Sequence, residues 1–314
     1  MVATNGKSWL VAAWPGMGNV GVIAGHVLVN QLGMEPVAAL SGEGVFDLEH
    51  VEVKDGVVGK PRLPRGVLYQ WKDAPIGKGL LVFLAEAQPS AHGLDYARAL
   101  LKEVSKYNVE RVFTFAAMAS QMHPSADARV FTAATDAGML DDLKAIDIHV
   151  LPEGQISGMN GLLLGAAVER SLPGACLLGE IPFYGAGVPN PKTAWALLDT
   201  FGALRDLHID TSELAEQAEK VERVLLNMFE QLGDDATGRD DDGDEEDDDE
   251  AGPELPASTG PAGLDNETQR RIDELFAQAQ RDRSTVVKLK SELDRLGVFR
   301  QYENRFLDLF RRAE

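Results

Sequence analysis

The chain has 314 residues, a hydrophobic share of 44% and a formal net charge of -20. This length can bury a sizeable core and suits one large domain with an extension. The acidic balance argues against a general nucleic-acid-binding protein, because phosphate contacts need clusters of Lys and Arg.

The chain shows no sign of a membrane or secretory protein. No apolar run is long enough to span a membrane, and the first residues lack the pattern of a signal peptide. A single cysteine, Cys176, excludes an internal disulfide framework and is typical of a reducing compartment. We therefore expect a cytoplasmic protein that does not act at a membrane.

The first elements are a strand, a glycine turn and a helix. Residues 7–14 predict a buried strand, and residues 22–32 predict a helix that ends at Gly33. Between them, Gly16, Gly18 and Gly21 have the spacing G-x-G-x-x-G. Such a turn places backbone N–H groups at a helix N-terminus, where an anion or a carbonyl oxygen could dock.

Strands and helices then alternate along the chain. Strands are predicted at residues 37–40, 80–85, 112–117, 146–151 and 175–181, and helices at residues 94–107, 161–169 and 192–201. Residues 46–69 alternate polar and apolar positions around Asp55-Gly56, which predicts a β-hairpin or meander inserted after the second strand. The alternation indicates an α/β fold with a mainly parallel sheet between helical layers.

The C-terminal third has a different composition. Residues 210–232 predict an amphipathic helix in which Asp210 and Glu213 form a capping box. The stretch 234–250 has 12 acidic residues and one basic residue, so we expect a disordered linker. The predicted domains are residues 1–232, the linker 233–263, and amphipathic helices in 264–314. The apolar stripes of these last helices could pack on the main domain, on a sister helix or on a partner.

A dinucleotide site at the glycine turn is not expected, in spite of the spacing. Such a site needs an acidic residue at the end of the second strand to bind the ribose. Ser41 stands there instead, with Glu43 close by, and Pro15 fits the usual tight turn poorly. The inserted hairpin also interrupts the expected βαβαβ unit. We therefore predict no nicotinamide, flavin or other cofactor.

Three motifs resemble those of the proteasome assembly chaperone-two (PAC-two) family. They are Trp-Pro-Gly-Met-Gly-Asn-Val-Gly at residues 14–21, Gly-Gln-Ile-Ser-Gly-Met-Asn-Gly-Leu-Leu-Leu-Gly at 154–165, and Pro-Asn-Pro-Lys-Thr-Ala at 189–194. The resemblance implies a three-layer α/β/α sandwich with a phosphorylase/hydrolase-like core, a homo-oligomer and a proteasome-related protein client. Family members are often labelled as an ATP-grasp superfamily, but the chain lacks a matching set of lysines and carboxylates for nucleotide and magnesium. Some archaeal members dock into the proteasome through a hydrophobic-Tyr-X tail, which residues 310–314 do not provide.

Candidate ligand-binding residues gather in and near these motifs, but none can be assigned a catalytic role. The candidates are Gly16, Met17, Gly18, Asn19, Ser120, Gln155, Ser157, Gly158, Asn160, Glu180 and Tyr184. The spacing around Ser157 does not match the nucleophile elbow G-x-S-x-G, so its hydroxyl and the Asn160 amide are expected to cap a helix that starts near Gly161. Glu180 could share a cleft with Glu153, and paired carboxylates would suit acid–base chemistry.

The histidines do not form a metal pair of the H-E-x-x-H type, so no metal site is predicted. The motifs favour a non-catalytic binding or assembly protein, chaperone-like and homo-oligomeric. The alternative is a hydrolase- or phosphorylase-like enzyme, or a nucleotide-binding protein, that uses the cleft at the glycine-rich turns. The first interpretation is preferred because three family motifs match while no catalytic set does.

Overall fold

The computed structural model describes residues 7–47, 51–146, 148–237, 266–281 and 285–296, and also residues 298, 302, 305, 306 and 309. The chain forms two compact units, Met1–Arg223 and Val224–Glu314. In the described part of the chain, no helix combines the length and the apolar character needed to cross a membrane. Most of the predicted linker, residues 233–263, lies outside the described residues, so the predicted domain boundaries stay predictions.

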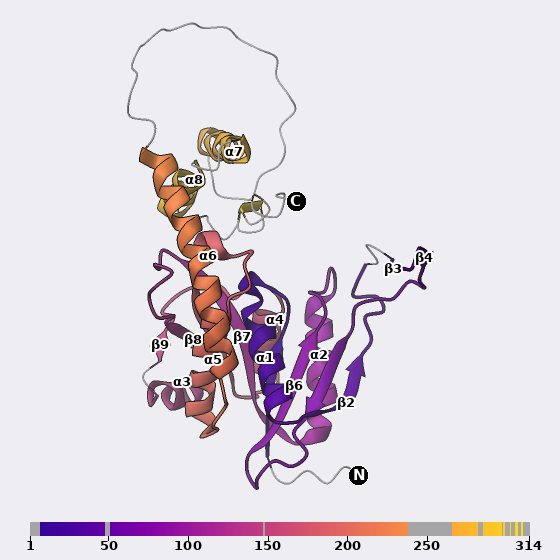
Figure 1. Cartoon of the computed structure of the whole chain (residues 1–314). Helices are drawn as coiled ribbons and strands as arrows, with labels where there is room; N and C mark the ends of the chain where they lie inside the picture. Colours follow the sequence, from indigo (N-terminus) through magenta and orange to yellow (C-terminus); the bar gives the residue numbers. More distant parts are fainter. Residues whose placement is uncertain are drawn as a thin grey trace, which may run out of the picture. The chain divides into compact units, whose positions relative to one another are not determined.

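An eight-stranded sheet is the centre of the first unit (Figure 1). Its order is β2-β5-β6-β1-β7-β10-β8-β9. The four central strands β6, β1, β7 and β10 run parallel, whereas β5 and β8 are antiparallel to their inner neighbours. The bounds are β1 (Ser8–Ala13), β2 (Glu35–Leu40), β5 (Gly66–Gln70), β6 (Gly79–Ala85), β7 (Val109–Ser120), β8 (Val130–Ala134), β9 (His149–Val150) and β10 (Gly174–Pro182).

Helices cover both faces of this sheet. On one face α1 packs beside α5, and on the other face α2 packs beside α4. The helices of the unit are α1 (Val20–Gln31), α2 (Gly93–Val104), α3 (Ala137–Lys144), α4 (Gly158–Glu169), α5 (Pro191–Arg205) and the first part of α6 (Ser212–Thr237). The predicted α/β sandwich is therefore confirmed.

The alternation of side chains along β1 supplies the two halves of the core. Trp9 points to the α5 face, where its ring lies 5.1 Å from Phe113 and 6.2 Å from Phe201. Trp14, just after the strand, points to the other face and joins a cluster that contains Tyr96 of α2 and Met159 of α4. Every residue of β1 is buried, as expected of a central strand between two helical layers.

The region between β2 and β6 differs in part from the predicted meander. The Asp55-Gly56 turn is confirmed: both residues have positive φ, 51° and 78°, as a tight hairpin turn requires. It connects β3 (Val53–Lys54) and β4 (Val57–Val58), which form a separate two-stranded sheet. The polar–apolar alternation further along belongs to β5, which is antiparallel to β6 in the main sheet.

Several boundaries differ from the prediction. The strand expected at residues 146–151 is limited to β9, and both β8 and α3 were not predicted. Helix α4 begins at Gly158 rather than near Gly161, because Gly158 takes a φ of 66° that lets the chain turn into the helix earlier. Helix α6 begins at Ser212, whose backbone N and side-chain Oγ donate to Asp210 Oδ1 at 3.0 and 2.7 Å.

Both edges of the main sheet are short or irregular. The edge strand β2 contains Pro36, and its pairing with β5 shifts register between Pro36 and Ala38. An ion pair between Glu35 and Lys72 lies at the same end. At the other edge, β9 contributes only two residues and pairs with β8 through Phe131 and Thr132.

The second unit contains a helical hairpin. Helices α7 (Asn266–Arg281) and α8 (Thr285–Arg295) pack against each other. The hydroxyl of Tyr302 donates to Gln269 Oε1 at 2.7 Å, and its ring lies 5.8 Å from that of Phe276. The predicted apolar stripes therefore face a sister helix, and their buried members are Ile272, Leu275, Phe276, Ala279, Val286, Leu289 and Leu293.

Candidate functional site

The first glycine turn lies at the carboxyl end of β1 and uses its own backbone groups for internal contacts. Gly18 has a φ of 59° and is buried, whereas Gly16 is exposed and extended. The N–H of Gly18 donates to Ala186 O at 2.8 Å, and the N–H of Asn19 donates to Gly16 O at 2.9 Å. The N–H groups that would hold a phosphate in a nucleotide-binding turn are thus already engaged.

The third motif is joined directly to this turn. The N–H of Asn190 donates to Gly18 O at 2.8 Å, and a Cβ on Gly18 would lie 3.2 Å from Asn190 Cβ. Asn190 also caps α5, because its Oδ1 accepts from the N–H of Thr193 at 3.0 Å. The Thr193 hydroxyl donates to Glu180 O at 2.6 Å, so the cap also fixes the end of β10.

The second motif reaches the turn through Gln88, which was not among the predicted site residues. Gln88 Nε2 donates to Pro15 O at 3.0 Å, and Gln88 Oε1 accepts from Met159 N in the first turn of α4 at 3.1 Å. Ser157 occupies the N-cap position as expected, but its side chain makes no capping hydrogen bond. The capping role predicted for Ser157 is therefore performed by a side chain from the loop after β6.

The predicted cap at Asn160 is also wrong. Asn160 lies inside the first turn of α4, and its Oδ1 is buried with no hydrogen-bond partner in the described residues. Gly161 serves packing instead: a Cβ there would lie 1.9 Å from the carbonyl oxygen of Ile156. The loop before α4 can fold back on the helix only because residue 161 has no side chain.

The candidate residues on β7 and β10 lie near the carboxyl ends of these two strands, but they do not form an acid–base pair. Glu180 is 2% exposed and binds Arg129 through two hydrogen bonds of 2.7 and 2.8 Å. Ser120 is aligned with Pro182, and its Oγ accepts from Met122 N at 3.1 Å. Burial raises the pKa of Tyr184 to about 12, so its hydroxyl stays protonated at neutral pH.

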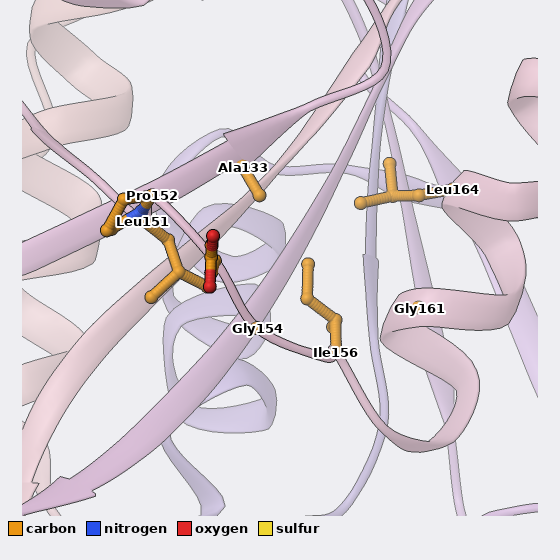
Figure 2. Close-up of a pocket in the computed structure, with 8 residues that line it drawn as sticks. Ala133, Leu151, Pro152, Gly154, Ile156, Gly161 and Leu164 are labelled. Atoms are coloured by element: carbon orange, nitrogen blue, oxygen red, sulfur yellow. The ribbon is translucent and has the colours of Figure 1, made fainter.

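A pocket of about 420 Å³ lies between the sheet and the loop before α4. Figure 2 shows Ala133 on the sheet side, Leu151 and Pro152 on the loop, and Leu164 on the helix. Glu153 is the one ionisable residue that lines it. Glu180 is not in its lining, so the cleft predicted to contain both carboxylates is not formed there.

The remaining candidates for chemistry are engaged in structure or exposed. Cys176 is fully buried in β10, and burial raises the pKa of its thiol to about 12, so the thiol is poorly placed to react. His26 is exposed on α1, and His123 Nδ1 accepts from Ser125 N at 3.2 Å in the loop after β7. Over the residues that the structure describes, no group of three His, Cys, Asp or Glu could hold a metal ion.

The three motifs are thus brought together by their backbone and by Gln88, while Arg129 binds Glu180 near the end of β10; neither partner was predicted. Gln88 follows β6, and Arg129 precedes β8 beside β10. Loops at the carboxyl ends of neighbouring parallel strands lie close together, on the side of the sheet where those strands end. A polar residue three positions after a predicted central strand was the signal that could have identified Gln88.

Comparison with known proteins gives consistent matches over the first unit. The sequence profile of the PAC2 family matches residues 10–228. Two uncharacterized proteins of Methanocaldococcus jannaschii are similar in sequence. MJ1210 is 28% identical over 228 residues, which cover 71% of this chain and 84% of that protein. MJ0106 is 23% identical over 224 residues, which cover 71% of this chain and 85% of that protein.

Solved structures of the same fold cover a similar part of the chain. Pyrococcus furiosus PbaB, an archaeal proteasome activator, has a TM-score of 0.61 at 24% identity, with 70% of this chain and 93% of that chain covered. Mycobacterium tuberculosis Rv2125, a proteasome-assembly chaperone homologue, has a TM-score of 0.60 at 21% identity, with 74% and 96% covered. These likenesses agree with the three-layer fold. Because the family profile extends over more than half of the sequence, the chain belongs to the PAC2 family, as the three motifs predicted.

Proposed function

We propose that the chain is a non-catalytic, chaperone-like protein that acts in the cytoplasm as a homo-oligomer and binds a proteasome-related protein. The observation that carries this proposal is the use of polar groups in the first motif and at the end of β10. The N–H groups of Gly18 and Asn19 and the carboxylate of Glu180 are all engaged by the protein itself. These groups hold the loops together, so their polar atoms serve the structure of the fold.

The proteasome-related client is inferred from the relatives. Two of the solved neighbours are PbaB, an archaeal proteasome activator, and PbaA, an archaeal homolog of proteasome-assembly chaperone. Family membership supports the same kind of role for this chain, although a shared fold does not by itself fix function. The single buried Cys176 suits a reducing compartment.

The proposal is tested with the purified full chain and the purified α- and β-subunits of the proteasome from the same organism. Native mass spectrometry should detect a complex of defined stoichiometry with one or more of these subunits, and the chain alone should be larger than a monomer. Complex formation should be unchanged in S120A and S157A, because neither hydroxyl has a catalytic role in the proposal.

Two results would contradict the proposal. The first is the absence of any complex with separate subunits or assembled particles at tens of micromolar, a concentration that detects even weak specific binding. The second is a hydrolytic activity of the wild-type chain that S157A or S120A abolishes.

A further inference from the structure

The β3–β4 hairpin is an apolar arm that the rest of the first unit does not cover. Every residue from 51 to 62 is exposed. Four of them are valines, with exposed fractions of 41% for Val51, 64% for Val53, 69% for Val57 and 63% for Val58. The hairpin forms a sheet of its own, apart from the eight-stranded sheet (Figure 1). An isolated two-stranded hairpin is at best marginally stable in water, so this arm needs a surface to pack on.

The valines are divided unequally between the two faces of the arm. Val53 pairs with Val58, and Lys54 pairs with Val57. Paired residues of an antiparallel ladder share a face, and side chains alternate along each strand. Val53 and Val58 therefore form the apolar face of the arm, whereas Val57 lies on the opposite face beside Lys54. The N–H of Gly59 donates to Glu52 O at 2.8 Å, so the pairing continues and places Val51 and Lys60 at the base of the Val53 face.

The charge of the arm permits contact with an acidic protein. Residues 51–60 contain two acidic and two basic side chains, so the arm is neutral in a chain of net charge -20. At its base, Arg62 and Arg65 bind Glu86, which fixes where the arm leaves the domain. A neutral arm can approach a second copy of this acidic chain without the repulsion that two acidic surfaces would produce.

A matching apolar surface lies on α4. Within the described first unit, Ile76 and two residues of α4, Leu162 and Val168, are the other exposed large apolar side chains. Asn160 and Glu169 are the only polar residues of α4, and a helix that is apolar on all sides is normally buried. Gly165 lies between the two exposed side chains and leaves open space, since a Cβ there would meet no atom within 4 Å.

We propose that the apolar face of the β3–β4 arm of one copy packs on the α4 surface of a second copy. Both surfaces belong to the first unit and both are exposed there, so the described residues of that unit do not cover them. A reciprocal exchange of two arms closes a two-fold dimer, the commonest symmetry of soluble oligomers. This inference rests on the homo-oligomer of the proposed function and names its interface.

The experiment is sedimentation equilibrium of the full chain and its variants. V53S/V58S removes apolar area from the arm face, and L162S/V168S removes it from α4. Each double variant should raise the dissociation constant of the oligomer at least about tenfold, which corresponds to 1.4 kcal/mol. V57S is the matched control on the opposite face of the arm and should leave association unchanged. All these side chains are exposed, so the midpoint of thermal unfolding at low protein concentration should not move.

A mixing experiment tests which surfaces meet. V53S/V58S chains mixed with L162S/V168S chains retain one intact arm-to-helix contact per dimer. The mixture should therefore associate more tightly than either variant alone. A mixture no tighter than its components would overturn the contact between arm and helix.

The remaining outcomes separate the inference from the proposed function. If the wild-type chain is oligomeric and V53S/V58S is equally so, the arm interface is wrong while the homo-oligomer stands. If V53S/V58S loses binding of proteasome subunits but associates normally, the arm serves a client rather than a second copy, which also overturns the inference. A wild-type chain that is monomeric at tens of micromolar overturns the homo-oligomer itself.

Discussion

At Gly21, helix α1 closely approaches the sheet. Replacement of Gly21 by Ala tests whether the glycine is needed to pack α1 against β7. A Cβ at residue 21 would lie 2.4 Å from the carbonyl oxygen of Phe115. Both positions are fixed by backbone, so the cost of overpacking should reach the upper end of its usual range, about 3 kcal/mol. Ala in a helix is favoured over Gly by about 1 kcal/mol. We therefore expect G21A to lower the free energy of unfolding by about 2 kcal/mol.

Gly165 provides the matched control, because it is also a helical glycine but has open space around it. At a protein concentration low enough to keep the chain monomeric, G165A should raise the free energy of unfolding by about 0.5–1 kcal/mol through helix propensity alone. The measurement is urea unfolding of the full chain followed by tryptophan fluorescence, with all proteins at one concentration. The four tryptophans, Trp9, Trp14, Trp71 and Trp195, all belong to the first unit, so the signal reports that unit.

Changes of opposite sign in the free energy of unfolding of G21A and G165A would support this packing role of Gly21. If G21A were as stable as the wild type, the close approach of α1 to β7 would not constrain residue 21 and the reasoning would be refuted. Gly21 would then have to be explained by some other role of the glycine turn.

Four further predictions concern the glycine turn and the elements around it. Q88A should lower the free energy of unfolding by about 1 kcal/mol through loss of two partly exposed hydrogen bonds. Q88E keeps the acceptor for Met159 N of α4 and should recover about half of this loss in the same assay. R129M leaves the buried Glu180 carboxylate unpaired and should lower the free energy of unfolding by about 2 kcal/mol. This loss is smaller than for a fully buried pair because Arg129 is largely exposed. The double variant R129M/E180M should recover most of the loss. Cys176, with a thiol pKa of about 12, should not react with a thiol reagent at pH 8 in the native chain but should react fully in denaturant; rapid native labelling would show that the thiol is accessible. Calorimetric titration with NAD, NADP or FAD should show no saturable binding at millimolar levels, and a micromolar dissociation constant would contradict the engaged N–H groups of the glycine turn.

The central strands were predictable because they are covered on both faces. The continuous apolar run at residues 80–85 and the mainly apolar segments at 112–117 and 175–181 correspond to β6, β7 and β10. The short strand β8 is half-covered and antiparallel, and β9 pairs through only two residues, so neither has a strong pattern. The place of β2 at the sheet edge, three positions from β1, depends on chain topology, which local patterns do not specify.

The candidate site was predictable in its backbone but not in its side-chain partners. The first two motifs contain the glycines that allow close approaches, and Gly18, Gly21 and Gly161 lie against neighbouring atoms. The roles of Gln88 and Arg129 depend on which loops and strands become neighbours after folding. Spacing along the chain contains no information on such distant pairs, so Ser157 was assigned a cap that Gln88 provides.

The two irregular edges of the main sheet restrict how this protein can meet others. An exposed edge strand offers free N–H and C=O groups to any extended peptide. Pro36 removes one donor from β2 and the register shift beside it breaks the regular ladder, while β9 offers only two residues. Neither edge is a good template for an added strand, so a partner has little opportunity to extend the sheet. Recognition is left to side-chain surfaces, and the same blunted edges protect an acidic, sheet-rich protein from growing into fibrils.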